Sequence, residues 1–187
     1  MTLKLGMVGG GQGAFIGGVH RIAARFDGRW QLVAGAFSSD PQRAAASAAD
    51  LGIAPDRAYA DFAQMALAEA ARTDRIDAVA IVTPNHLHAA VATAFLKAGI
   101  PVICDKPMTA TLAEAEDLAA LVRETDLPFV LTQTYTGYPM VREARAMVAR
   151  GDIGDVRHVQ VEYIQDWLAG PIERDGQKQA VWRTDPL

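Results

Sequence analysis

A glycine-rich run follows the first apolar segment of this 187-residue chain and precedes a segment with helical spacing. Residues 9–17 read G-G-G-Q-G-A-F-I-G, and Gly9, Gly11 and Ala14 match the pattern G-x-G-x-x-[G/A]. After a strand, the first glycine allows a tight turn, the second lets the backbone approach a pyrophosphate, and the small third residue lets the helix pack on the strand. Free N–H groups at the helix start attract phosphate oxygens. We therefore predict a dinucleotide site at Gly9, Gly11, Gln12, Gly13, Ala14, Phe15 and Ile16, against the alternative of a glycine turn without a ligand.

Two further groups of polar residues follow apolar runs that we predict to be strands. The first comprises Thr83, Pro84, Asn85 and His88, and the second comprises Asp105 and Lys106. Ligands of open α/β sheets bind outside the carboxyl ends of the strands, so both groups are candidates for one site. The alternatives are a plain strand-to-helix turn capped by Asn85 and a solvated lysine before a proline.

Other residues with reactive side chains are interpreted structurally. His86 and His88 resemble a metal-binding pair, but no cysteine or carboxylate lies near them at ligand spacing, so we predict no metal. Cys104 ends an apolar run and is interpreted as a buried small hydrophobe rather than a catalytic thiol. Tyr135 and Tyr138 could line a ligand pocket or pack within the fold.

The elements that must position these residues alternate between strands and helices. The predicted strands are Leu3–Val8, Leu32–Phe37, Ala78–Val82, Val102–Cys104 and Phe129–Thr132. The predicted helices are Phe15–Phe26, Pro41–Leu51, one after Asp61 to Arg72, one after Asn85 to Ala98, one after the capping box Thr111-x-x-Glu114 to Thr125, and Pro139–Arg150. The first helix takes its spacing from Ile16, Val19, Ile22, Ala23 and Phe26. Apolar strands joined by helices predict an α/β fold with a doubly wound parallel sheet.

The pattern changes after Gly154. Arg157–Ile164 alternates polar and apolar residues, which predicts an antiparallel strand with one wet face. Residues 165–187 carry Trp167 and Trp182 and show no period. We therefore predict a first domain over residues 1–134 and the incomplete beginning of a second, α+β domain over residues 135–187.

Composition excludes several classes of partner. Half of the residues are hydrophobic, 21% are charged, and the formal net charge is −4 without a basic stripe, which disfavours nucleic acid and anionic membranes. No apolar run approaches the roughly 20 residues that span a bilayer. One cysteine allows no intrachain disulfide, so we expect a cytoplasmic protein.

Four segments together resemble the Gfo/Idh/MocA oxidoreductases, the family of glucose–fructose oxidoreductase and inositol dehydrogenase. They are Gly9–Gly17, Thr83-Pro84-Asn85-x-x-His88, Asp105-Lys106-Pro107 and Gly151-x-Ile153-Gly154. Asp105 departs from the Glu that the family usually carries, and Thr134 departs from its usual Asn. The resemblance implies an N-terminal Rossmann domain, a larger C-terminal domain with an open sheet that usually pairs with another subunit, and NAD(P)-linked chemistry on sugars or polyols. It also implies cofactor contacts at Thr83, Pro84, Asn85, His88, Asp105, Lys106 and Gln133.

Within that resemblance Lys106 is the expected catalytic residue. An ammonium near the reacting hydroxyl orients it and stabilises developing alkoxide charge in a dry site. A separate base must take the proton. The family's Asp-x-Gly-x-His segment, which supplies that base, does not occur in this chain, whose histidines are His20, His86, His88 and His158. His20 is expected on the pyrophosphate side of the fold. A non-catalytic cofactor-binding or regulatory protein on the same scaffold is the competing hypothesis.

The preference between NAD and NADP depends on the end of the second strand. An NAD-selective site usually has an acidic residue there, but this chain has Ser38 and Ser39, with Arg43 one helical turn further on. Ser38 removes the repulsion of a 2′-phosphate, and Arg43 could pair with it. Asp40 complicates this interpretation, since its carboxylate could instead cap the next helix. The sequence slightly favours NADP.

Overall fold

The computed structural model describes residues 2–164, 166 and 169–176 of the chain. The chain divides into two compact units, residues 1–137 and 138–187, and each is described by itself. The first unit contains all of the strands found in the described residues.

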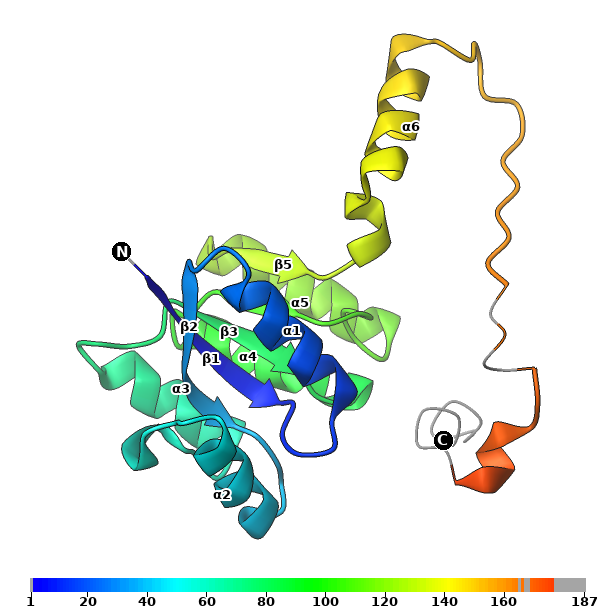
Figure 1. The fold of residues 1–187 in the computed structure, drawn as a ribbon. Coiled ribbons are helices and arrows are strands. Elements are labelled where there is room, and N and C mark those ends of the chain that lie inside the picture. Colours follow the sequence, from blue (N-terminus) through cyan, green and yellow to red (C-terminus); the bar gives the residue numbers. More distant parts are fainter. Residues whose placement is uncertain (1, 165, 167–168, 177–187) are drawn as a thin grey trace. The chain divides into compact units, whose positions relative to one another are not determined.

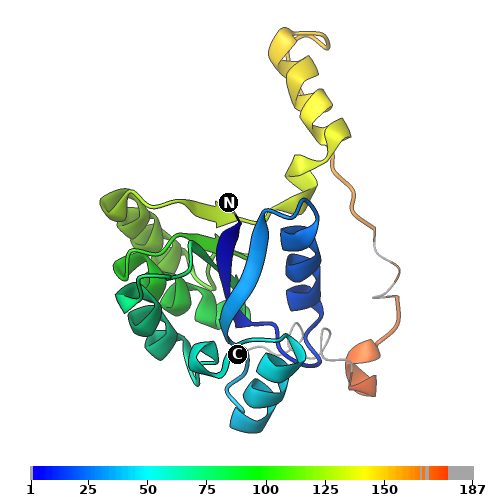
Figure 2. The same ribbon diagram turned by 60° about the vertical axis from the view of Figure 1, so that its left-hand side comes forward.

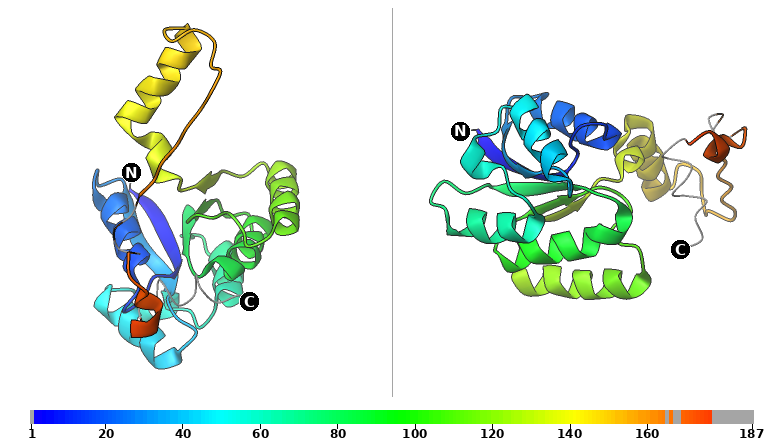
Figure 3. Two further views of the ribbon diagram at one scale, coloured as in Figure 1. Left: turned by 90° about the vertical axis from the view of Figure 1, so that its right-hand side faces the viewer. Right: turned by 90° about the horizontal axis from the view of Figure 1, so that it is seen from below.

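A five-stranded parallel sheet forms the centre of the first unit. Its strands are β1 (Leu3–Gly9), β2 (Trp30–Ala36), β3 (Ala78–Val82), β4 (Val102–Cys104) and β5 (Phe129–Leu131), in the order β2-β1-β3-β4-β5. Helices α1 (Phe15–Arg25) and α2 (Pro41–Asp50) cover one face; α3 (Phe62–Ala71), α4 (His88–Lys97) and α5 (Leu112–Thr125) cover the other (Figures 1 and 3). The doubly wound α/β fold predicted for this part of the chain is confirmed.

The two faces of the sheet carry separate apolar cores because side chains alternate along each strand. In β3, Ala80 and Val82 belong to the core under α1 and α2, while Val79 and Ile81 belong to the core under α3, α4 and α5. All five residues of β3 are buried, as expected for a central parallel strand covered on both sides.

The helix starts agree with the sequence at three of four predicted caps. The carboxylates of Asp40 and Asp61 accept the backbone N–H groups of Arg43 and Gln64, and Thr111 forms the complete capping box with Glu114. The predicted Asn85 cap is wrong. Asn85 begins a short 3₁₀ turn (Asn85–Leu87), and α4 then starts at His88 without a side-chain cap.

Most of the apolar stripe predicted for α1 faces away from the sheet, although Ile16 packs against the core. Val19, Ile22 and Phe26 are 43%, 63% and 90% exposed, whereas the side facing the sheet carries Gly17, His20, Arg21 and Ala24. Close approach of the helix to the glycine-rich run requires a residue without a side chain on that side, and Gly17 supplies it. Figure 2 shows α1 lying beside β1 and β2.

The second unit contains one long helix, α6 (Pro139–Arg150), which ends at Gly151 with φ of 77° as the sequence predicts. The strand predicted over Arg157–Ile164 is absent, since residues 156–164 have no regular structure. A strand needs a hydrogen-bonded neighbour, and the described residues of this unit provide none. Trp167 and Trp182 lie outside the described residues.

None of the described helices is both long enough and apolar enough to cross a membrane.

Candidate functional site

The candidate site lies at the carboxyl edge of the sheet, where the chain order reverses between β1 and β3. Gly9 at the end of β1 pairs with Val82 at the end of β3, and Ile81 pairs with Cys104 on β4. Three predicted segments, which begin at Gly9, Thr83 and Asp105, are thereby brought side by side. This switch point is where open α/β sheets bind ligands.

The backbone of the glycine-rich loop is packed too closely for side chains at several positions. A Cβ on Gly17 would lie 2.7 Å from the carbonyl oxygen of Gly10, and a Cβ on Gly11 would lie 2.6 Å from Ser47 Oγ. Gly9 and Gly10 have φ of 81° and 72°, which favours glycine. Ala14 is the exposed N-cap of α1, so Gly17, not the predicted Ala14, is the small residue that lets the helix pack.

Polar tethers hold this loop to the neighbouring helices. The backbone N–H of Gln12 donates to Ser47 Oγ at 2.9 Å, and the Gln12 side chain donates to Asp50 at 2.6 Å. Arg21 of α1 donates to the carbonyl of Gly10 at 2.7 Å. Glycine is therefore required at position 11 for packing against α2. The sequence pattern explained Gly11 only by the approach of a ligand.

The N-terminus of α1 differs chemically from those of α2, α3 and α5. No side chain caps it, and its first turn, which includes Phe15 and Ile16, contains no acidic residue. Its first backbone N–H groups are therefore available to an anion. Gly13 lies at the exposed tip of the same loop, where a Cβ would meet nothing within 4 Å.

The Thr83 and Lys106 turns are joined by His88. The His88 side chain is fully buried, with Nδ1 2.6 Å from the carbonyl oxygen of Pro107 and Nε2 3.0 Å from that of Thr83. The buried hydroxyl of Thr83 has no hydrogen-bond partner. Pro84 is exposed and Asn85 is half-buried at the start of the 3₁₀ turn.

Asp105 is the centre of a polar cluster beside Lys106. Thr132 donates to Asp105 Oδ1 at 2.9 Å, and His20 Nε2 lies 3.5 Å from the same oxygen. Burial raises the pKa of the Asp105 carboxyl, but hydrogen bonds from His20, Thr132 and the Lys106 backbone, with the charge of His20, bring that pKa below its usual range. The Lys106 side chain is exposed.

A family model described as "Oxidoreductase family, NAD-binding Rossmann fold" matches residues 3–133. The chain belongs to the Gfo/Idh/MocA family. The oxidoreductase YfiI of Bacillus subtilis is 37% identical over 188 aligned positions, which are 98% of this chain and 47% of that protein.

Two solved structures extend the comparison. An oxidoreductase from Sinorhizobium meliloti has 60% identity and a TM-score of 0.85, covering 90% of this chain and 47% of its own. An inositol dehydrogenase homolog from Azotobacter vinelandii, solved with NAD⁺, has 40% identity and a TM-score of 0.92, covering 100% of this chain and 48% of its own. This member of the Gfo/Idh/MocA family thus spans about half the length of these relatives.

His20 belongs to α1 as predicted, and sequence reasoning missed its partner. Its Nε2 lies 3.5 Å from Asp105 Oδ1, just after β4. The one sequence signal is spacing, because His20 lies in the same i, i+4 row of α1 as Ile16 and Ala24, which pack against the core. The partner of His20 could not be read from that pattern.

The segment after β2 keeps its predicted residues near the start of α2. Asp40 Oδ1 accepts the Arg43 backbone N–H at 2.7 Å, and Ser38 Oγ accepts that of Asp40 at 3.1 Å. Ser39 and Arg43 are exposed, and Ser38 is half-buried. Asp40 therefore caps the helix, as the alternative interpretation held. Its carboxylate nevertheless stays next to Ser38 and Ser39, where a 2′-phosphate is expected.

The remaining predicted residues have simpler surroundings. Gln133 is exposed just after β5. Cys104 is fully buried, and burial, with the charge of Asp105, raises the pKa of its thiol to about 12, which leaves it unreactive at neutral pH. Over the described part of the chain, no three His, Cys, Asp or Glu side chains gather closely enough to hold a metal.

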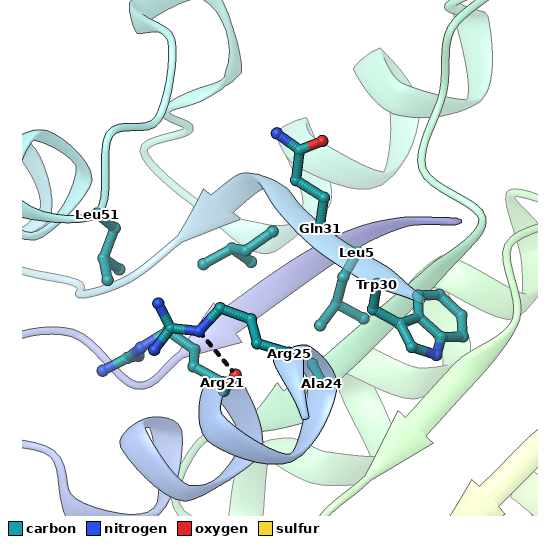
Figure 4. Close-up of a pocket in the computed structure, with 8 residues that line it drawn as sticks. Leu5, Arg21, Ala24, Arg25, Trp30, Gln31 and Leu51 are labelled. Atoms are coloured by element: carbon teal, nitrogen blue, oxygen red, sulfur yellow. Dashed lines mark hydrogen bonds between the residues drawn. The ribbon is translucent and has the colours of Figure 1, made fainter. Parts of the chain in front are cut away.

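A separate cavity of about 180 Å³ lies between α1 and β2, shown in Figure 4. Its walls are apolar side chains such as Leu5 and Trp30 together with Arg21 and Arg25. No residue of the glycine-rich loop lines it, so it is not the candidate site.

Proposed function

We propose that this chain is the cofactor-binding part of an NAD(P)-dependent dehydrogenase that transfers a hydride between a nicotinamide and a sugar or polyol hydroxyl. The observation that carries the proposal is the convergence of the glycine-rich loop, the Thr83 turn and Lys106 at one switch point. Inositol dehydrogenase homology in the solved relative with NAD⁺ supports the same class of reaction.

The residues fit a dinucleotide. The loop has glycine at positions 9, 10, 11 and 13, and its one longer side chain, Gln12, is bonded to Asp50 of α2. The start of α1 is uncapped, and its N–H groups would bind the pyrophosphate. The nicotinamide, when bound, accepts or gives the hydride. Thr83, with its unpartnered hydroxyl, and the backbone at Pro84 and Asn85 would lie against its ribose.

Lys106 would bind and orient the reacting hydroxyl of the substrate. Its ammonium makes no hydrogen bond or ion pair with any residue that the structure describes, so it is available. The ammonium stabilises alkoxide charge as the proton leaves. Asp105 would hold the turn through His20 and Thr132, and the base would come from a segment with the family's Asp-x-Gly-x-His arrangement.

The test uses the complete protein with a panel of sugars and polyols, and follows nicotinamide reduction. Reduction with at least one polyol is expected, and replacement of Lys106 by Met should lower kcat by about 10²–10³. Binding of the cofactor without reduction of any substrate would instead favour a non-catalytic or regulatory protein on this scaffold.

For the cofactor, we propose a preference for NADP, which rests on the half-buried Ser38, the exposed Ser39 and the exposed Arg43. The Asp40 carboxylate opposes it, although one of its oxygens is engaged by the helix. Fluorescence titration of NADH and NADPH decides the matter. Arg43→Gln should weaken NADPH binding more than NADH binding, and NADH affinity more than tenfold above that of NADPH would overturn the preference.

Assembly and location are proposals as well. We propose a homo-oligomer formed through the C-terminal domain, because apolar side chains such as Val159 and Val161 are exposed in the second unit (72% and 83%). Light scattering of the complete protein tests this. A cytoplasmic location and the absence of nucleic-acid or membrane partners stay predictions from composition.

A further inference from the structure

The cavity between α1 and β2 has no role in the proposed function. It occupies about 180 Å³, and its apolar walls come from β1, α1, β2 and the end of α2, with the side chains of Leu5, Ala24, Trp30, Leu32 and Leu51. An apolar cavity of about 150 Å³ is large enough to bind benzene in a protein interior. The space between α1 and β2 can therefore hold a six-carbon ring or chain.

Two arginines give this apolar cavity a positively charged end. Arg21 and Arg25 lie one helical turn apart on α1, and both line the cavity. Figure 4 shows their guanidinium groups close together at one end and Trp30 at the other. No carboxylate of the described residues forms an ion pair with either arginine. Burial, with the positive charge of Arg25, lowers the pKa of Arg21, as expected where two cations lack an anion between them.

Hydrogen bonds hold both arginines in place without using all of their donors. Arg21 Nη1 donates to the carbonyl of Gly10 at 2.7 Å, and Arg25 Nε donates to the carbonyl of Arg21 at 3.3 Å. No residue that the structure describes accepts from Arg21 Nη2 or from either terminal nitrogen of Arg25. Guanidinium N–H groups that are already held in position suit the oxygens of a carboxylate.

We propose that this cavity is a second binding site of the chain, for a small carboxylate whose apolar body has about six carbons. The body would lie against Leu5, Leu32 and Trp30, and the carboxylate would accept hydrogen bonds from Arg21 and Arg25. A sugar or polyol suits the cavity poorly, because most of its hydroxyls would face apolar walls without a hydrogen-bond partner. The site is separate from the switch point, since no residue of the glycine-rich loop lines it.

Tryptophan fluorescence of the 187-residue chain tests binding, because Trp30 lines the cavity. The chain has three tryptophans, so the double variant Trp167→Phe/Trp182→Phe leaves Trp30 as the only one. Hexanoate and benzoate should each change the Trp30 emission in a saturable way. Acetate lacks the apolar body and 1-hexanol lacks the charge, so both should bind at least about tenfold more weakly than hexanoate. The absence of a saturable change with both larger carboxylates would overturn the proposal, and so would equal affinities for hexanoate and 1-hexanol.

The charged end of the site is tested with Arg25→Gln and the matched control Arg29→Gln. Arg25 is replaced rather than Arg21, because Arg21 also bonds Gly10 of the glycine-rich loop. Arg29 is exposed, pairs with Asp27 and does not line the cavity. Hexanoate affinity should fall about tenfold or more in Arg25→Gln and stay unchanged in Arg29→Gln. Equal affinities of the two variants would show that the arginine pair does not bind the carboxylate.

The apolar part of the site is tested with Ala24→Leu. Ala24 lines the cavity from α1, so a longer side chain there would occupy the space of the ligand's body. Hexanoate binding should be lost while circular dichroism shows a folded chain. Unchanged hexanoate affinity in folded Ala24→Leu would place the ligand elsewhere and refute the site. If Ala24→Leu does not fold, the comparison of Arg25→Gln with Arg29→Gln still decides.

This inference does not depend on the proposed function. Failure of the unaltered chain to bind NADH or NADPH would count against the cofactor site alone. The hexanoate titrations would keep their meaning in that case.

Discussion

At the scale of single residues, adjacent glycines in α1 have opposite roles. A Cβ on Gly17 would collide with the backbone of Gly10 in the glycine-rich loop, whereas a Cβ on Gly18 would meet only the tip of Arg21 at 3.9 Å. Gly17 is buried against the loop, and Gly18 is an ordinary helix-interior glycine, where Ala is the better helix former.

The pair makes a matched experiment. Gly17→Ala should destabilise the chain by about 1–3 kcal/mol, because backbone cannot move aside as a flexible side chain can. Gly18→Ala should stabilise it by about 0.5–1 kcal/mol. Urea unfolding measures both, and NADH titration should show weaker binding only for Gly17→Ala. Equal stabilities of the two variants would contradict the packing seen at Gly10.

At the scale of elements, a buried ion pair joins α3 to the segment before it and to the start of β3. Glu69 of α3 is fully buried and accepts hydrogen bonds from Arg57 Nε at 3.0 Å, the Tyr59 hydroxyl at 2.7 Å and the Ile76 N–H at 3.1 Å. Oε1 accepts from Arg57 and Tyr59, and Oε2 accepts from Arg57 and the Ile76 N–H, so Glu69 joins three segments at once. Ala58, between Arg57 and Tyr59, also bridges to Gly35 of β2.

Removal of one partner of this pair should be costly. Glu69→Leu leaves the buried Arg57 guanidinium with only the half-exposed Asp74 as its ion-pair partner and should lower the free energy of unfolding by about 3–5 kcal/mol. The double variant Arg57→Met/Glu69→Leu should lose less, because no buried charge remains unpaired. The exposed pair of Arg150 and Glu143 is the control, and Glu143→Gln should cost about 0–1 kcal/mol. Urea unfolding of these variants beside the unaltered chain gives the values.

The same network predicts a loss of stability at high pH. Burial raises the pKa of Tyr59 to about 12, helped by its hydrogen bond to Glu69 and by the negative charge of Glu69. The stabilisation that Tyr59 provides is complete at pH values below its pKa in the unfolded chain, which is about 10. It is lost as the pH rises towards the pKa in the folded chain, with a slope of about 1.4 kcal/mol per pH unit. Tyr59→Phe should lack this decline when unfolding is followed between pH 9 and 12. Parallel curves for the two chains would contradict it.

At the scale of the whole molecule, the chain divides into a Rossmann unit with the candidate site and a second unit in which residues 156–164 have no regular structure. The relatives with which it was compared are about twice as long. We therefore expect the 187-residue chain to bind NADH or NADPH without oxidising a sugar. A missing general base alone lowers a rate by about 10²–10⁴, and absent pocket walls add to the loss.

Steady-state assays of this chain beside a version that carries a complete C-terminal domain test that expectation. Activity should appear only in the longer protein, while cofactor titration gives similar affinities for both. Equal activity of the two would show that a residue of this chain acts as the base, and His20, beside Asp105 and Lys106, would then be the first to replace.

The sequence by itself determined the order of strands and helices, the parallel sheet and the place of the glycine-rich loop. These features follow from local periods and turn residues, such as the capping box at Thr111 and the glycine after Arg150, which act over a few positions. It could not show which side of α1 meets the sheet, because the apolar stripe and the need for a glycine at position 17 point in opposite directions. The alternation of polar and apolar residues over 157–164 predicted a strand that does not form, since a strand requires a hydrogen-bonded neighbouring strand.

Only the tertiary structure decided which distant groups meet. His20 contacts Asp105, His88 contacts the carbonyls of Thr83 and Pro107, and Gln12 donates to Ser47 and Asp50. These contacts join elements that the sheet order brings together. Hydrogen bonds and close backbone contacts depend on separations of tenths of an ångström. Such separations are set by how whole helices and strands pack, and no local pattern of residue types contains them.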